Sequence, residues 1–355
     1  MNLSNRQVGL LSTSRMFGGG IANFPAGYVA DRYPGRFAQI LGLSVSFIGV
    51  TGFLLGISDN YFMVTIMAAC MVGSISFYHP SAISNLSRQF SARRGFAISL
   101  HGTGGSVGQA VGPIIVGLLL GIVSWDFLFR ISIIPATVSG FVIWSLLSRI
   151  PAEASSNLSI SKYLNNVSVL LKTRSLLLIL VFTGGFAGAQ NILMTFFPLY
   201  LRENLDFSSA ELGIYLAMAQ VMGIISQPVM GFFSDKWGRR VILAPALIVL
   251  SISYFLIPLA GSGIYLILTV CIMGAFLYSL MAIFVAAAVD LVEDKVQATT
   301  VSLVFGFATA IAGVAPGIAG IFADLFGIQS TFWVASSIVG CTGVMSFITN
   351  WESNK

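Results

Sequence analysis

Long apolar segments of about 20 residues follow one another through almost the whole chain, and they limit the folds open to it. A helix needs about 20 apolar residues to cross a bilayer, and a helix satisfies its own backbone hydrogen bonds in lipid. Charged residues make up only 9% of the chain, against about 25% in soluble domains. The sequence therefore predicts an all-α membrane protein with about eleven transmembrane helices, at 8–30, 37–57, 61–86, 95–122, 127–148, 175–201, 210–233, 241–261, 264–289, 298–323 and 331–350.

Lysine and arginine are divided unevenly between the two sets of loops. Alternate loops and the tail carry fourteen of the 18, the opposite loops carry only Arg6 and Arg202, and Arg15 and Arg130 fall within spans. Cytoplasmic loops of membrane proteins are enriched in these residues. We therefore expect a multi-pass protein of the cell membrane whose basic loops and C-terminus are cytoplasmic and whose Met1 lies outside.

One basic turn occurs twice along the chain. Gly231-Phe-Phe-Ser-Asp235-Lys236-Trp-Gly238-Arg239-Arg240 joins two spans, and a weaker copy, Gly27-Tyr-Val-Ala-Asp31-Arg32-Tyr-Pro-Gly-Arg36, lies 204 residues earlier. The same offset relates Gly19 to Gly223 and Asn23 to Gln227. The aspartate can stabilise helix ends while the cations stay near the headgroups. Two copies of one membrane unit are typical of transporters.

These two turns resemble the loop motif that the major facilitator superfamily carries after its second and eighth helices, although Pro34 replaces or precedes the motif glycine in the first copy. The resemblance implies a two-bundle helical transporter with twelve helices. The span 175–201 has no counterpart before 8–30, so the family's first helix is expected to be missing from this chain. Either the start codon is placed too far downstream or the protein begins here.

The longest inner connection divides the predicted halves. We expect an N-terminal bundle of five spans at 1–148, a cytoplasmic linker at 149–174 and a six-helix bundle at 175–355. Within the linker, Ile160, Leu164, Val167 and Leu171 recur at helical spacing beside lysines. This pattern predicts a short amphipathic helix on the membrane surface, either a passive tether or a regulatory element.

Glycines recur every four residues in the span 95–122, where small residues allow helices to approach closely. The members are Gly104, Gly108 and Gly112, followed by Pro113 and Gly117. The run resembles the fifth-helix motif of drug exporters in the superfamily, and the stretch from Phe77 to Pro113 is similar to fosmidomycin-resistance-type exporters. It predicts either a fixed packed pair or a hinge. The fourth-helix arginine of many proton-coupled exporters would fall near Ala69 and is absent.

Ionisable residues inside spans are candidate substrate or coupling sites. Arg15 needs water, a carboxylate or a substrate anion, and His79 and His101 are predicted at similar depth, where they exchange protons, bind an anion or pack as neutral rings. Arg130 is expected to pair with Asp126. Uncharged candidates are Gln190, Asn191, Gln220 and Tyr278, and the resemblance implies that the central path favours Gln190, Asn191 and Tyr278.

The leading functional prediction is a secondary transporter that works by alternating access, as a proton-coupled antiporter for efflux of a small organic compound or drug. Metabolite uptake and a non-transporting receptor or scaffold are the alternatives. Enzyme chemistry is not expected, because the Gly-x-Ser-x-Gly pattern around Ser106 lies within one helix, and no phosphate-binding loop is present. We expect no metal, other cofactor or nucleic acid; the sequence predicts no oligomeric state.

Overall fold

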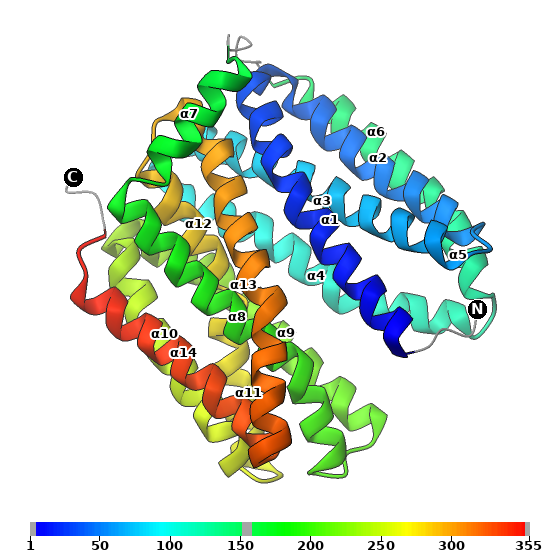
Figure 1. Cartoon of the computed structure of the whole chain (residues 1–355), viewed down its shortest axis with the longest axis vertical. Coiled ribbons are helices and arrows are strands. Elements are labelled where there is room, and N and C mark those ends of the chain that lie inside the picture. The colour runs from blue at the N-terminus through cyan, green and yellow to red at the C-terminus, as the bar shows by residue number, and fades with distance from the viewer. Residues whose placement is uncertain (1–4, 151–157, 352–355) are drawn as a thin grey trace. The chain divides into compact units, whose positions relative to one another are not determined.

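The computed structural model describes residues 5–150 and 158–351, and within these ranges the chain forms helices and short 3₁₀ turns without strands (Figure 1). The first half contains α1 (Asn5–Arg32), α2 (Phe37–Gly56), α3 (Tyr61–Gln89), α4 (Arg94–Leu120), α5 (Trp125–Ile131), α6 (Ile133–Leu147) and α7 (Ile160–Leu170). The second contains α8 (Arg174–Glu203), α9 (Ser209–Trp237), α10 (Arg239–Leu256), α11 (Ile264–Leu277), α12 (Leu280–Asp290), α13 (Gln297–Phe326) and α14 (Gln329–Ile348).

Ten stretches in the described ranges are long and apolar enough to cross a membrane, and they match the expected spans from 37–57 onwards. The first expected span forms the 28-residue helix α1, which is long enough but is less apolar and is not among the ten.

Two spans are interrupted, between α5 and α6 and between α11 and α12. Pro135 has no N–H to donate to the carbonyl of Ile131, which favours the first break.

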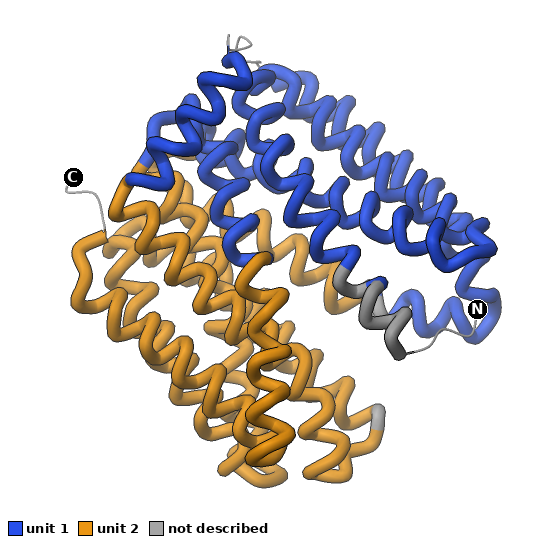
Figure 2. The backbone as a smooth tube through the Cα atoms, viewed as in Figure 1, with its two compact units in different colours: residues 1–89, 112–172, 292–309 blue, residues 90–111, 173–291, 310–355 orange. Residues whose placement is uncertain are grey.

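The chain divides into two compact units, which Figure 2 colours separately. Unit 1 comprises residues 1–89, 112–172 and 292–309, and unit 2 comprises 90–111, 173–291 and 310–355. Both α4 and α13 cross a unit boundary. The beginning of α4 therefore packs with later parts of the chain, and the beginning of α13 packs with earlier parts. These units are not the predicted bundles 1–148 and 175–355, and the division of the chain into those two bundles stays a prediction.

Small residues allow close helix contacts in unit 1. A Cβ on Gly18 of α1 would lie 2.7 Å from the carbonyl oxygen of Ala69 on α3, and one on Gly42 of α2 would lie 2.6 Å from the carbonyl oxygen of Gly140 on α6. The Ser76 hydroxyl also donates to the Gly19 carbonyl, at 2.9 Å. Helices pack in lipid through such contacts, and Gly18 and Gly19 give α1 this kind of contact with α3.

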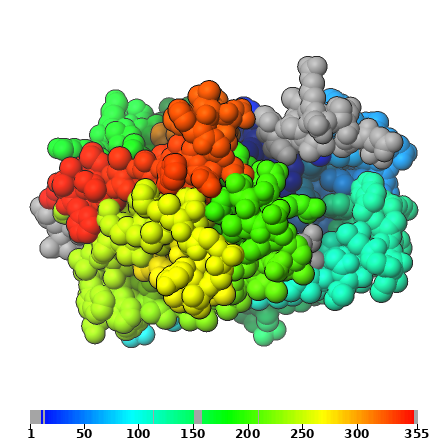
Figure 3. Space-filling model, turned by 90° about the horizontal axis from the view of Figure 1, so that it is seen from below, coloured from blue at the N-terminus to red at the C-terminus, as the bar shows by residue number. Residues whose placement is uncertain are grey.

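Large side chains fill the core of unit 2. Phe186 lies 5.7 Å from Phe284, and Tyr200 meets Phe332 edge to face at 5.1 Å, measured between ring centroids. Trp351 is buried beyond the end of α14, where its indole N–H donates to the Ser346 carbonyl at 3.1 Å. Seen from below, atoms coloured from green through yellow to red form a continuous surface (Figure 3).

The glycine run of α4 does not form the expected helix contact. No described atom outside α4 lies within 4 Å of a Cβ placed on Gly104, Gly108, Gly112 or Gly117. The helix runs unbroken through Pro113, from Arg94 to Leu120. Small residues permit close packing without enforcing it, and no described residue of another helix approaches the run. The predicted packing role of these glycines is therefore not seen in this structure.

Candidate functional site

The first copy of the basic turn caps the beginning of α13 within unit 1. Asp31 is buried, and its carboxylate accepts from the backbone N–H groups of Ala298 at 3.0 Å and Thr299 at 2.8 Å, and from the Thr299 hydroxyl. The first N–H groups of a helix lack partners within it, and a carboxylate there also meets the positive end of the helix dipole. We call this contact the Asp31 cap.

Gly27 lies one helical turn before Asp31 on the same face of α1. A Cβ there would lie 2.6 Å from the Ser302 hydroxyl oxygen and 3.1 Å from the Thr299 Cα. The glycine therefore brings α1 close enough to α13 for the aspartate to reach its first turn. This geometry explains the Gly-x-x-x-Asp spacing of the turn.

The second copy makes the same contact in unit 2, with a different helix. The backbone N–H of Gly95 donates to Asp235 Oδ1 at 2.8 Å, and that of Phe96 donates to Oδ2 at 2.7 Å. A Cβ on Gly231 would lie 2.6 Å from the Gly95 carbonyl oxygen and from the Ser99 Cβ. We call this contact, at the beginning of α4, the Asp235 cap. The sequence predicted that the aspartate stabilises helix ends, and both caps confirm it.

Arginine side chains extend the Asp235 cap into a network of charges. Arg239 Nη1 lies 2.6 Å from Asp235 Oδ1, and Arg239 Nε donates to Asp290 Oδ2 at 2.9 Å. Arg94 Nη1 lies 3.1 Å from the other Asp290 oxygen. Neither Asp290 nor Arg94 was among the site residues predicted from the sequence. No local pattern could have found them, because they come from α12 and α4.

The remaining motif residues have separate positions. Gly238 links α9 to α10 with φ 101°, a conformation that favours glycine. Lys236 and Arg36 are exposed, and Arg240 donates to the Phe347 carbonyl. Arg32 donates to the Tyr28 hydroxyl and, at 2.7 Å, to the Leu158 carbonyl in the linker. The two copies thus share the aspartate cap and differ in how their cations are used.

A mainly apolar cavity of about 440 Å³ with a few polar groups lies in unit 1 between α1, α3 and α13. Arg15 and His79 both line it, and the His79 ring stacks on Phe305 with centroids 5.3 Å apart. Its other described lining residues are Met16, Gly19, Asn23, Val72, Ile75, Ser76 and Thr309. None of the described lining residues carries a carboxylate. The cavity therefore combines a fixed positive charge, an aromatic face and neutral polar groups.

The two candidate histidines belong to different units. His79 lies on α3 in unit 1, and His101 lies half-buried on the part of α4 that belongs to unit 2. The proposed action of the histidines as a pair stays a prediction. Phe305 and Thr309 were missed by the sequence reasoning because both come from α13, far from Arg15 and His79 in the chain.

Several uncharged candidates have hydrogen-bond partners inside unit 2. The Gln220 amide donates to the Ser106 carbonyl at 3.2 Å, and the Asn191 amide donates to the Ala312 carbonyl at 2.5 Å. Gln227 donates to the Ser106 hydroxyl at 2.8 Å and to the Tyr278 carbonyl at 2.9 Å. Gln220 and Tyr278 therefore lie near one polar cluster around Ser106, whereas Gln190 is half-buried on α8.

The ion pair expected near the start of α5 is also present. Arg130 donates to Asp126 one helical turn before it. Pairs at this spacing face each other on a helix. Arg130 and Asp126 thus neutralise each other at the start of α5. Arg15, the other arginine predicted within a span, lines the cavity of unit 1.

Comparison with known proteins identifies the family to which this fold belongs. A model of the Major Facilitator Superfamily matches residues 1–224 and 185–354. This chain belongs to the Major Facilitator Superfamily. The two copies of the basic turn fall in different matches, at 27–36 in the first and at 231–240 in the second. The family and the fold together indicate a multi-pass membrane protein that carries out secondary transport of small molecules.

Relatives of this facilitator match along most of its length. The fosmidomycin resistance protein of Escherichia coli (strain K12) is 24% identical over 345 residues, which cover 94% of this chain and 82% of that protein. The MFS-type transporter YfnC of Bacillus subtilis (strain 168) is 23% identical, with 98% and 85% covered. A crystal structure of the E. coli fucose:proton symporter FucP has a TM-score of 0.80 at 14% identity, covering 98% of this chain and 92% of that one. The predicted superfamily and all-α fold are confirmed.

Proposed function

We propose that this facilitator exports a small organic compound in exchange for protons, working by alternating access. The observation that carries the export direction is the relationship to the fosmidomycin resistance protein along 94% of the chain. The two caps support the alternating mechanism. Each holds the beginning of a helix from the other sequence half by hydrogen bonds to one carboxylate, and such contacts form and break as discrete units.

The cavity of unit 1 supports an organic anion as the exported compound. A charged side chain within a membrane span costs about 2.5 to 3.5 kcal/mol on insertion scales, and the planar guanidinium of arginine matches the geometry of carboxylates and phosphates. An anionic group would pair with Arg15. The Phe305 ring and the Asn23 amide would contact the apolar and polar parts of the same compound.

Uptake with protons is the second candidate, because two matching proteins are named as carriers of sugars or sugar acids. FucP is titled a fucose:proton symporter, and the hexuronate transporter of Bacillus subtilis (strain 168) is 23% identical over 92% of this chain. Both are transporters whose names give no export role. The scaffold alternative predicts no movement of any substrate.

A flux assay in liposomes separates these functions. The purified protein is reconstituted, a pH gradient of either sign is imposed, and accumulation of labelled fosmidomycin and a panel of other small organic anions is followed. Antiport requires accumulation when the interior is acidic and its loss on adding a protonophore. Accumulation with an acidic exterior favours uptake by symport, and no movement of any compound in either gradient favours the scaffold.

Replacing Arg15 by glutamine should weaken substrate binding between about tenfold and about 100-fold, because a charge-assisted hydrogen bond contributes about 1.5 to 3 kcal/mol and about 1.4 kcal/mol corresponds to tenfold in affinity. The half-saturating concentration in the flux assay measures the change. Arg202→Gln is the matched control, since Arg202, like Arg15, is exposed but is not among the described residues that line the cavity. Equal effects of the two substitutions would remove Arg15 from the binding site.

A further inference from the structure

Helix α7 is held at the edge of the bilayer by the chain on either side of it. A candidate span ends at Leu147 before the linker, and the next begins at Arg174, only a few residues after α7 ends at Leu170. An extended chain covers at most about 3.3 to 3.6 Å per residue. The C-terminal end of α7 therefore cannot leave the membrane boundary.

The side chains of α7 fall on three faces when placed at 100° per residue. Tyr163 and Leu170 form the buried face. About a quarter turn away, Ile160 and Leu164 form an apolar strip that is 64% and 60% exposed, and Leu171 continues it. Most side chains of the remaining face are polar and exposed, with Ser161, Asn165 and Ser168 nearest the strip. Val169, 56% exposed, is the apolar exception on this face and lies beside Lys162.

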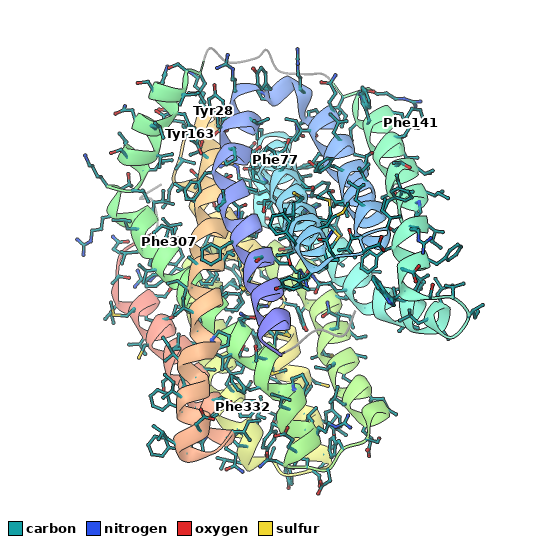
Figure 4. The ribbon with its side chains drawn as sticks, turned by 45° about the vertical axis from the view of Figure 1, so that its right-hand side comes forward. Tyr28, Phe77, Phe141, Tyr163, Phe307 and Phe332 are labelled. Carbon is teal, nitrogen blue, oxygen red and sulfur yellow. The ribbon has the colours of Figure 1, made fainter. Side chains whose placement is uncertain are left out.

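Contacts with α1 fix the rotation of this helix. The Tyr163 hydroxyl donates to the Phe24 carbonyl at 2.7 Å, and its ring meets the Tyr28 ring edge to face, with centroids 5.3 Å apart. Figure 4 labels Tyr28 and Tyr163, which lie close together. The Tyr28 hydroxyl donates to the Leu158 carbonyl at 3.3 Å. Burial, with the nearby charge of Asp31, raises the pKa of Tyr163 to about 12, so this hydroxyl keeps the proton that it donates.

We propose that α7 docks on the inner leaflet, with Ile160, Leu164 and Leu171 among the lipid chains and with Lys172 and Arg174 near anionic headgroups. An interfacial helix has this combination of an apolar strip, a polar face and neighbouring cations. Lys162 lies about half a turn from the strip and remains on the water side. The packed face prevents the strip from rolling inwards, so lipid is the surface that covers it.

Membrane depth at two positions of the same helix tests the docking. In full-length protein whose Cys70, Cys271 and Cys341 are replaced by serine, a nitroxide is attached through Leu164→Cys or Ser168→Cys. The protein is reconstituted in vesicles that contain phosphatidylglycerol. The label at 164 should collide more with oxygen than with a water-soluble nickel chelate, and the label at 168 should show the reverse. Preferential collision with nickel at both positions, or protection of position 164 from both reagents, would overturn the proposal.

The headgroup contact is tested separately by charge removal. Each juxtamembrane cation contributes enough attraction to an anionic surface to change the docked-to-undocked ratio about fivefold. Lys172→Gln and Arg174→Gln should each lower this ratio by about that factor in phosphatidylglycerol vesicles and leave it unchanged in phosphatidylcholine. Lys162→Gln is the matched control on the water side. An equal loss with Lys162→Gln would contradict the assignment of the cations, independently of whether the protein transports any compound.

Discussion

Asp235→Asn should release the beginning of α4 and raise the labelling rate of a cysteine at position 99 at least about 100-fold. Asp235 accepts from Gly95 and Phe96 and pairs with Arg239, whose side chain is 10% exposed. Removing one partner of a buried ion pair costs about 3 to 5 kcal/mol, and about 1.4 kcal/mol is tenfold in an equilibrium. Ser99 is fully buried beside Gly231, so maleimide labelling of Ser99→Cys in membranes reports the open fraction.

Asp324→Asn is the control for this measurement. It makes the same chemical change on an exposed carboxylate of α13, and the labelling rate should not change. Transport by Asp235→Asn should fall as well, because a cap that no longer forms removes one of the two states of the cycle. Unchanged labelling of Ser99→Cys in the Asp235→Asn protein would show that the cap does not hold α4 in place.

The apolar segments and the 204-residue offset predicted most of the fold. Ten of the expected spans are present, because local sequence determines helix length. In both copies of the turn the aspartate caps the beginning of a helix, because local sequence also determines the position of the capping residue. The receiving helices were not predictable. Which helix begins opposite Asp31 or Asp235 depends on long-range packing, and neither Thr299 nor Gly95 carries a local signal of this role.

Only part of the candidate site could be predicted, because residues that come together through long-range packing carry no local signal. Arg15 and His79 were selected as rare ionisable residues within spans, and the structure places both on one cavity. Phe305 completes the cavity from α13 and has no feature in the sequence that distinguishes it from other phenylalanines. The glycines of α4 were predicted as either a packed pair or a hinge. The packed contact is not seen among the described residues, because a run of small residues does not specify what lies opposite it, and the hinge stays a prediction.

The difference between the two caps bears on how the transporter opens. Asp235 belongs to a network with Arg239, Asp290 and Arg94. Asp31 holds α13 through two backbone N–H groups and the Thr299 hydroxyl, and the charge of Arg88 acts on it as well. Breaking the Asp235 cap therefore disturbs several charge pairs at once. The Asp31 cap requires α1 and α13 to approach closely at Gly27. A substitution of Gly27 therefore tests this cap.

Gly27→Ala should weaken the Asp31 cap by between fivefold and about 100-fold, and Ser302→Gly should restore much of the loss. The added Cβ would lie 2.6 Å from the Ser302 hydroxyl oxygen, 3.0 Å from its Cβ and 3.1 Å from the Thr299 Cα. Overpacking of this kind costs about 1 to 3 kcal/mol. Removing the Ser302 side chain eliminates the two closest contacts and leaves the third, so recovery is expected to be large and incomplete.

A double-mutant cycle measures this coupling. Midpoints of thermal unfolding in detergent are compared for Gly27→Ala, Ser302→Gly and the double variant, since Ser302→Gly alone costs about 0.5 to 1 kcal/mol within a helix. Gly20→Ala on the same helix is the control, because a Cβ there meets no described atom within 4 Å. Additive losses in the double variant would mean that Gly27 does not set the distance between α1 and α13. A double variant more stable than Gly27→Ala would tie the glycine of the motif directly to the capping of α13.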